Sequence, residues 1–324
     1  MNWIKSRIQS FVEKAKATFN KNRPSKQAQS ESLWVSCPGC KEMQLKTDLV
    51  SQLGICKCSY HFDLDPKTTF EKIIFDNGEY TLIECPKWAD PDPLKVSIEG
   101  KKYIDKYKGY QKKTGQESAL LVAHGNINGL KAVVVGYCFA FGGAAYSPRE
   151  NEHFLAAAQY ALDNKVDLFL SIYQSGGMSL FGNVHSLVGM SKAQMAHTML
   201  KKNNIVTIGI LEQKITGGTF VNTFGNMFLF SSSPCNQSQL FSGKRVSAGV
   251  RSSDNQEMPS DFGESQSLEK HGMIDGCFNS RIEIKERVTQ LVKVLLKKHE
   301  QQSTSKNVEI DESINYKSQN TAGA

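Results

Sequence analysis

The stretch VDLFLSIYQSGG, residues 166–177, decides the fold class. Residues 166–173 are almost all apolar, which is typical of a strand buried on both faces of a sheet. A glycine pair ends the stretch, and a helical pattern follows over 179–203. The order recurs at 205–218, where IVTIGILEQKITGG runs from a second buried strand into another glycine pair. Alternating strands and helices predict an α/β body.

A third glycine pair, Gly142-Gly143, follows the apolar run CFAF. A β-hairpin is predicted just before it, over 119–137, with its turn at Asn128-Gly129. Repeated strand–glycine–helix units predict stacked ββα turns. The sequence holds no GxGxxG or GxxxxGK[ST] motif, so a dinucleotide or P-loop site is not predicted. GxSxG and HExxH are absent as well, and a hydrolase is not predicted.

The glycine pairs are candidate site residues. A glycine at a strand-to-helix turn lets a ligand approach the main chain closely. The first N–H groups of the following helix are unpaired and lie at the positive end of its dipole. Together these features form a site for an oxyanion, which can be a thioester enolate, a carboxylate or a phosphate. One pair alone would be explained by a tight turn, and the repetition favours a site.

Four of the eight cysteines lie close together in the sequence. Cys37 and Cys40 form a CxxC pair, and Cys56 and Cys58 form a CxC pair that is one residue shorter than usual. Two such pairs predict a zinc ribbon. His61 can replace one of the thiolates, so the fourth ligand stays open. The remaining cysteines are isolated and are expected to be buried spectators: Cys85, Cys138, Cys235 and Cys277.

The positive charge is concentrated in an N-terminal arm. Lys and Arg total 39 against 32 Asp and Glu, and residues 1–30 carry most of the excess. The arm reads as an amphipathic helix, and 20–32 as a linker. It can contact nucleic acid, anionic lipid or an acidic partner, or serve as a solubilising leader. Neither a secretory signal nor a membrane-spanning run is predicted, and the cysteine usage indicates the cytoplasm.

The cysteine segment, the linker and the glycine repeats resemble the β subunit of bacterial and plastid acetyl-CoA carboxylase carboxyltransferase. The resemblance runs from the opening MNWI to about Leu296. It rests on CPGC with the later cysteine pair, YKGYQKKTGQESALLVAHGNINGLKAVVVGYCFAFGG, the SGG and TGG turns, and HGMID near the end.

This resemblance implies a crotonase-like (ClpP/crotonase) ββα superhelix with an N-terminal zinc ribbon. The expected divisions are an arm and linker at 1–32, the ribbon at 33–62, the crotonase-like domain at 63–299 and a disordered tail at 300–324. The implied reaction moves a carboxyl group from carboxybiotin to acetyl-CoA, giving malonyl-CoA for fatty acid synthesis. The implied partners are an α subunit, in an α2β2 heterotetramer, and a biotin carboxyl carrier protein.

The resemblance also implies roles for particular residues. Gly176 and Gly177 would form the catalytic enolate hole. The other two pairs would bind the coenzyme A thioester: Gly142, Gly143, Gly217 and Gly218. Zinc would be held by Cys37, Cys40, Cys56 and Cys58. In the family, biotin acts as the general base once CO₂ has left it, which agrees with the absence of a His–acid pair at recognisable spacing in the sequence.

One departure keeps two alternatives open. The family reads ARMQE after the first glycine pair of the body, whereas residues 178–182 here read MSLFG. A divergent paralogue that acts on another acyl thioester, as a specialised carboxylase or decarboxylase, would share the enolate hole. A non-catalytic paralogue would bind the α subunit or nucleic acid through the basic arm and the ribbon.

Overall fold

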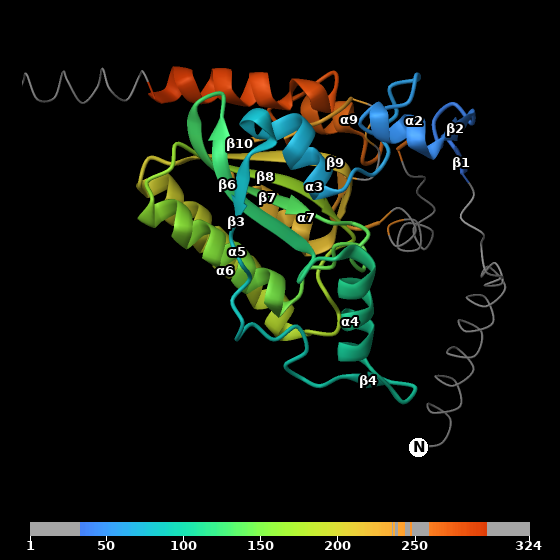
Figure 1. Cartoon of the computed structure of the whole chain (residues 1–324), viewed down its shortest axis with the longest axis vertical. Helices are drawn as coiled ribbons and strands as arrows, with labels where there is room; N and C mark the ends of the chain where they lie inside the picture. Colours follow the sequence, from blue (N-terminus) through green and yellow to red (C-terminus); the bar gives the residue numbers. More distant parts are fainter. Residues whose placement is uncertain (1–32, 235, 237–238, 244–246, 248–258, 297–324) are drawn as a thin grey trace, which may run out of the picture.

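The computed structural model describes residues 33–234, 236, 239–243, 247 and 259–296 (Figure 1). The basic arm, the linker and the polar tail predicted from the sequence lie outside these residues. In the described part of the chain, no helix combines the length and the apolar composition needed to cross a membrane.

One eight-stranded mixed sheet forms the centre of the molecule. Its order is β12-β10-β9-β8-β7-β6-β3, and β11 pairs with the end of β9. The strands are β3 (Tyr80–Leu82), β6 (Leu120–Ile127), β7 (Leu130–Tyr137), β8 (Leu168–Ser175), β9 (Val206–Thr216), β10 (Phe228–Ser231), β11 (Gln239–Leu240) and β12 (Gly276–Cys277). The pairings from β7 through β8, β9 and β10 to β12 are parallel, whereas β6 and β3 are antiparallel additions.

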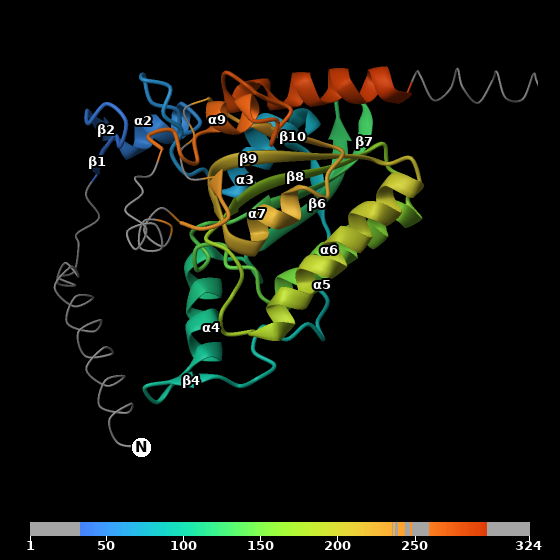
Figure 2. The same ribbon diagram turned by 180° about the vertical axis from the view of Figure 1, so that it is seen from behind.

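Helices cover both faces of the sheet (Figures 1 and 2). They are α3 (Pro66–Thr69), which continues as a π-helical turn over Phe70–Ile74, α4 (Tyr103–Thr114), α5 (Pro148–Asp163), α6 (Val184–Lys202), α7 (Gly217–Thr223), α9 (Ser265–Lys270) and a helix at 284–296. Alternate residues of β8 face opposite sides. Phe169 packs in the cluster shared with α5 and α6, and Leu170 packs in the cluster shared with the π-helical turn and the helix at 284–296. The prediction of a strand buried on both faces is therefore confirmed.

Local sequence signals explain how several elements begin. The hairpin β6–β7 turns at Asn128 and Gly129, whose φ angles of 47° and 80° fit the left-handed angles that this short turn requires. α5 begins with Ser147 as its N-cap in a capping box with Glu150, and Pro148 occupies the first turn. β6, β7 and α5 form a ββα unit, whereas the next two units each contribute one long strand and one helix.

The cysteine-rich segment lies at one end of the sheet. It contains β1 (Trp34–Ser36), β2 (Met43–Leu45) and α2 (Lys46–Ser51). A small hairpin of β4 (Ser97–Ile98) and β5 (Lys101–Lys102) precedes α4. Arg281 connects the cysteine-rich segment to the body, because its guanidinium donates to the carbonyls of Leu53 and Phe62 and pairs with Glu212 on β9.

Candidate active site and cysteine cluster

The three glycine pairs meet at one edge of the sheet. Each follows one of the parallel strands β7, β8 and β9, and the carboxyl ends of parallel strands lie along the same edge. The N–H of Gly176 donates to the carbonyl of Gly143 over 2.8 Å. The N–H of Tyr146 donates to the carbonyl of Gly177 over 3.0 Å. The structure thus brings together the glycines that the sequence singled out.

The second and third glycine turns are in direct backbone contact. A Cβ atom on Gly177 would lie 3.2 Å from the carbonyl oxygen of Thr216, and one on Gly217 would lie 3.3 Å from the Cα of Gly177. Both residues also have positive φ angles, 110° and 64°. These positions therefore favour glycine for two independent reasons, the close approach and the backbone angle.

Most N–H groups of these turns already have acceptors inside the chain. Gly177 donates to Ser175 Oγ at 3.0 Å, and Gly217 donates to the carbonyl of Phe241 at 2.8 Å. Gly142 and Gly143 donate to carbonyls of the preceding turn. Within the described residues, the N–H groups of Met178 and Gly218 have no hydrogen-bond acceptor.

The direction of the Met178 N–H follows from strand pairing. Tyr146 and Met178 form an isolated parallel bridge, in which Tyr146 bonds to Gly177 and Ser179. In such a bridge the N–H of Met178 points away from Tyr146. Sequence reasoning singled out the glycines and missed this donor, because strand pairing decides which N–H of a turn is free.

An aromatic cavity of about 180 Å³ adjoins the glycine turns. Phe181 stacks on Tyr103 with ring centroids 4.0 Å apart. The ammonium of Lys106 lies 5.4 Å from the Phe181 centroid. The other lining residues are Tyr107, Tyr110, Phe141, Gly142, Ala145, Met178, Ser179 and Leu180. Residues 178–181 therefore form one wall of a cavity beside the turns.

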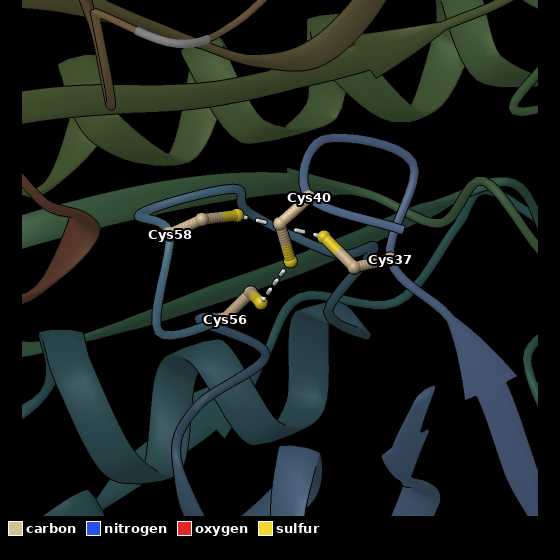
Figure 3. A group of neighbouring side chains, drawn as sticks. All are labelled: Cys37, Cys40, Cys56 and Cys58. Carbon is tan, nitrogen blue, oxygen red and sulfur yellow. Dashed lines mark hydrogen bonds between the residues drawn. The ribbon is translucent and has the colours of Figure 1, made fainter. Parts of the chain in front are cut away.

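The four predicted cysteine ligands form one cluster (Figure 3). Their sulfur atoms all lie within 4.8 Å of one another, and the cluster does not include His61. The Sγ atoms of Cys37 and Cys58 are 3.6 Å apart, and those of Cys40 and Cys56 are 3.7 Å apart. A tetrahedral zinc site with Zn–S bonds of about 2.3 Å places its sulfurs about 3.8 Å apart. The geometry of the donor set therefore fits zinc.

The pKa values of the thiols differ within the cysteine cluster. Burial raises the pKa of the Cys56 thiol to about 12. Burial also raises the pKa of the Cys58 thiol, but hydrogen bonds with the Tyr60 backbone and the other thiols outweigh it and lower this pKa to about 7. His61 is buried, neither of its ring nitrogens has a hydrogen-bond partner in the described structure, and burial lowers its pKa to about 3. The imidazole is therefore neutral at neutral pH.

Comparison with known proteins assigns the family. The model of the carboxyl transferase domain matches residues 102–322. The chain belongs to the carboxyl transferase family. The acetyl-coenzyme A carboxylase carboxyl transferase subunit beta of Pelagibacter ubique is 33% identical over 310 residues, 95% of this chain and 96% of that protein. The protein of the same name from Brucella ovis is 30% identical over 300 residues, 92% and 95% of the two chains. This carboxyl transferase chain is thus related to enzyme subunits along almost its whole length.

Solved structures share the fold. Transcarboxylase 12S, determined as a hexamer with methylmalonyl-coenzyme A bound, gives a TM-score of 0.57 at 15% identity, covering 71% of this chain and 41% of that one. A Pseudomonas malonate decarboxylase hetero-tetramer in complex with malonate gives 0.54 at 16% identity, covering 72% and 82%. The carboxyl transferase fold is therefore common to carboxylating and decarboxylating enzymes.

Proposed function

We propose that this chain is the β subunit of an acetyl-CoA carboxylase carboxyltransferase. It transfers a carboxyl group from carboxybiotin to acetyl-CoA, giving malonyl-CoA for fatty acid synthesis. The observation that carries the proposal is the convergence of three glycine turns around the unpaired N–H groups of Met178 and Gly218, in a chain whose relatives are named as this subunit. A crotonase-like ββα superhelix is the finer fold class that accompanies it.

The turns suit the chemistry of a thioester enolate. Removing a proton from the methyl group of acetyl-CoA places negative charge on the thioester oxygen, and fixed backbone donors stabilise such charge. Gly176 and Gly177 form the hole, because their missing side chains let the thioester approach and their turn presents the N–H of Met178. The glycine pairs 142–143 and 217–218 line the same cleft and bind the coenzyme A thioester.

No protein base is assigned to the reaction. When bound, carboxybiotin would supply the carboxyl group and a basic nitrogen for the methyl proton. The chain's part is to hold the thioester oxygen against the N–H of Met178 while the methyl carbon gains the carboxyl group. Charge stabilisation and orientation are the contributions expected from such a site.

We also propose that the segment 33–62 is a zinc ribbon, with Cys37, Cys40, Cys56 and Cys58 as ligands. The sulfur distances support this assignment. When bound, zinc would hold the two cysteine pairs together and supply folding free energy to a segment with a small core. The boundaries 63–299 for the carboxyltransferase domain belong to the same proposal.

The proposed partners are an α subunit, in an α2β2 heterotetramer, and a biotin carboxyl carrier protein, in the cytoplasm. The relatives are named as β subunits, which supports a complex of several chains. Nucleic-acid binding through the arm remains a prediction from charge, because residues 1–32 lie outside the described structure.

The second candidate function is that of an enzyme acting on a different acyl thioester. The observation that favours it is the aromatic wall at Phe181. This wall lies in the segment 178–182, where the resemblance leads us to expect ARMQE. An aromatic wall favours apolar groups beside the turns, and this changes which acyl group or thioester binds there.

The test is the reverse reaction, malonyl-CoA-dependent carboxylation of biocytin, with the chain mixed with the α subunit of its own genome. Turnover is expected, and Gly177→Val should lower it on the order of 10²-fold by blocking backbone approach. Gly109→Val is the matched control, because a Cβ at Gly109 on α4 meets nothing within 4 Å. No turnover from a folded, zinc-loaded complex would favour the second candidate, and unchanged turnover in a folded Gly177→Val would reject the hole.

A further inference from the structure

Ser175 contacts all three glycine turns through one hydroxyl. It is the last residue of β8 and is fully buried. Its Oγ donates to the carbonyl of Ala144 over 2.7 Å and accepts the N–H of Gly177 at 3.0 Å. Oγ1 of Thr219, in the first turn of α7, lies 3.2 Å away. The loops that follow β7, β8 and β9 are thus joined at a single oxygen atom.

The single proton of this hydroxyl has more than one acceptor within reach. A serine hydroxyl carries one proton and two acceptor positions. The carbonyl of Ala144 can only accept and is the shortest contact, so it takes the proton of Ser175. The Gly177 N–H fills one acceptor position. Oγ1 of Thr219 is a second, longer acceptor for the proton of Ser175, and the Thr219 hydroxyl itself donates to Sδ of Met178 at 3.8 Å. Thr219 is also fully buried, so its hydroxyl has no access to water.

These bonds fix the donor that the proposed reaction uses. Ser175 holds the peptide group before Gly177, since it accepts the N–H of that residue. The peptide group after Gly177 contains both the carbonyl that accepts from Tyr146 and the N–H of Met178. In a trans peptide these two groups point in opposite directions. With both neighbouring peptide planes held, the direction of the Met178 N–H is set.

Ala144, which follows the glycine pair 142–143, has an unfavourable backbone angle. Its φ of 48° lies in the left-handed region, which non-glycine residues rarely occupy, and it is buried. Its carbonyl is the acceptor for Ser175. The hydroxyl therefore stabilises an unfavourable backbone angle in the loop that faces the second glycine turn.

We propose that Ser175 is a positioning residue for carboxyl transfer and that Thr219 is its hydrogen-bonding partner. Both act through the backbone of the glycine turns and neither touches the substrate. This inference rests on the proposed function, and the experiment separates the failure of one from the failure of the other.

The experiment measures malonyl-CoA-dependent carboxylation of biocytin by the full chain with its α subunit, together with thermal unfolding of each variant. Ser175→Ala should lower kcat about 10- to 100-fold and leave KM for malonyl-CoA within about twofold, because only the orientation of the donor changes. Thr219→Val keeps the side-chain shape and removes the hydroxyl, and it should lower kcat in the same way. Thr219→Ser keeps the hydroxyl and should restore kcat.

Ser118→Ala is the control for the loss of a buried serine hydroxyl. Ser118 is fully buried and bonds to Leu120 and His153, away from the glycine turns. Its removal should lower stability and leave kcat unchanged. If Ser175→Ala does not fold, the comparison of kcat between Thr219→Val and Thr219→Ser tests the positioning role.

Three results would overturn the inference. They are a folded Ser175→Ala with wild-type kcat, a rise in KM without a loss of kcat, and equal kcat values for Thr219→Val and Thr219→Ser. The absence of turnover in the wild-type complex would instead contradict the proposed function. The positioning role would then be rejected as well, because it rests on that function.

Discussion

His197 is a buried histidine whose ring nitrogens have no hydrogen-bond partner among the described residues. It lies on α6 and packs against the rings of Phe154 and Phe169, with centroids 5.4 and 6.2 Å away. Burial, and secondarily Lys201, lowers its pKa from 6.5 to about 4. The imidazole is therefore neutral in the folded protein at neutral pH, and protonation favours the unfolded chain.

This shift gives a pH dependence with a definite sign. Because the folded pKa is lower than the unfolded value, the stabilisation is complete above pH 6.5 and is lost as pH falls towards 4. At pH 5 the loss should be about 2 kcal/mol relative to pH 7.5. His197→Leu should lose less stability than the wild type over that interval, as measured by urea unfolding at both pH values. Equal losses in the two proteins would contradict the assignment.

The cysteine-rich segment is the element whose stability depends on metal. We expect about one zinc per chain, and Cys40→Ser should release it, because the thiolate is replaced by a much poorer ligand. The segment 33–62 should then become sensitive to protease. Zinc content by elemental analysis and limited proteolysis are the measurements.

Cys277→Ser is the matched control for this element. Cys277 lies on β12 and is outside the four-cysteine cluster, so its variant should retain zinc. A wild-type protein purified without metal, or a Cys40→Ser protein that keeps a full zinc, would argue against the ribbon.

At the scale of the whole molecule, Arg281 joins the cysteine-rich segment to the sheet. Its side chain is 2% exposed, its partner Glu212 is 8% exposed, and the N···O distance is 3.0 Å. Arg281→Met would leave the Glu212 carboxylate buried without its partner and remove the bonds to Leu53 and Phe62. We expect a loss of about 3–5 kcal/mol in the free energy of unfolding.

A double variant shows whether the stability loss in Arg281→Met comes from the unpaired Glu212 carboxylate or from lost packing. Adding Glu212→Leu to Arg281→Met removes the buried carboxylate and should recover part of the stability. Denaturant unfolding of the wild type, the single variant and the double variant gives the comparison. A double variant that is less stable than the single variant would show that the carboxylate has other partners.

Much of the fold was predictable because strong local signals agree with the tertiary structure. The apolar run at 166–173 predicted a doubly buried strand, and β8 confirms it. The turn at Asn128-Gly129 predicted the hairpin, and the helix expected over 179–203 begins at Val184. The start of α6 was missed because residues 178–182 remain part of the site loop, where Met178 bridges to Tyr146.

The site was predictable only as far as its glycines and cysteines. Cysteine spacing and glycine pairs report local chemistry, so both could be found in a single sequence. The free N–H at Met178 could not be found in this way, because it depends on pairing with a loop that is distant in the sequence. The roles of Ser175 and Thr219 could not be predicted either. Ser175 belongs to the SGG turn, but a serine or threonine in the sequence carries no sign of its hydrogen-bond partners.

The sequence by itself determined the alternation of strands and helices, the metal-binding residue types and the family, because each of these is recorded in short-range pattern and residue identity. The tertiary structure alone decided which backbone donor is free and what joins the parts. Parallel pairing of β7, β8 and β9 brings their three turns to one edge. Arg281 reaches Leu53 across 228 positions of the chain. Such contacts exist only once the chain has folded, because no local pattern encodes a partner so distant.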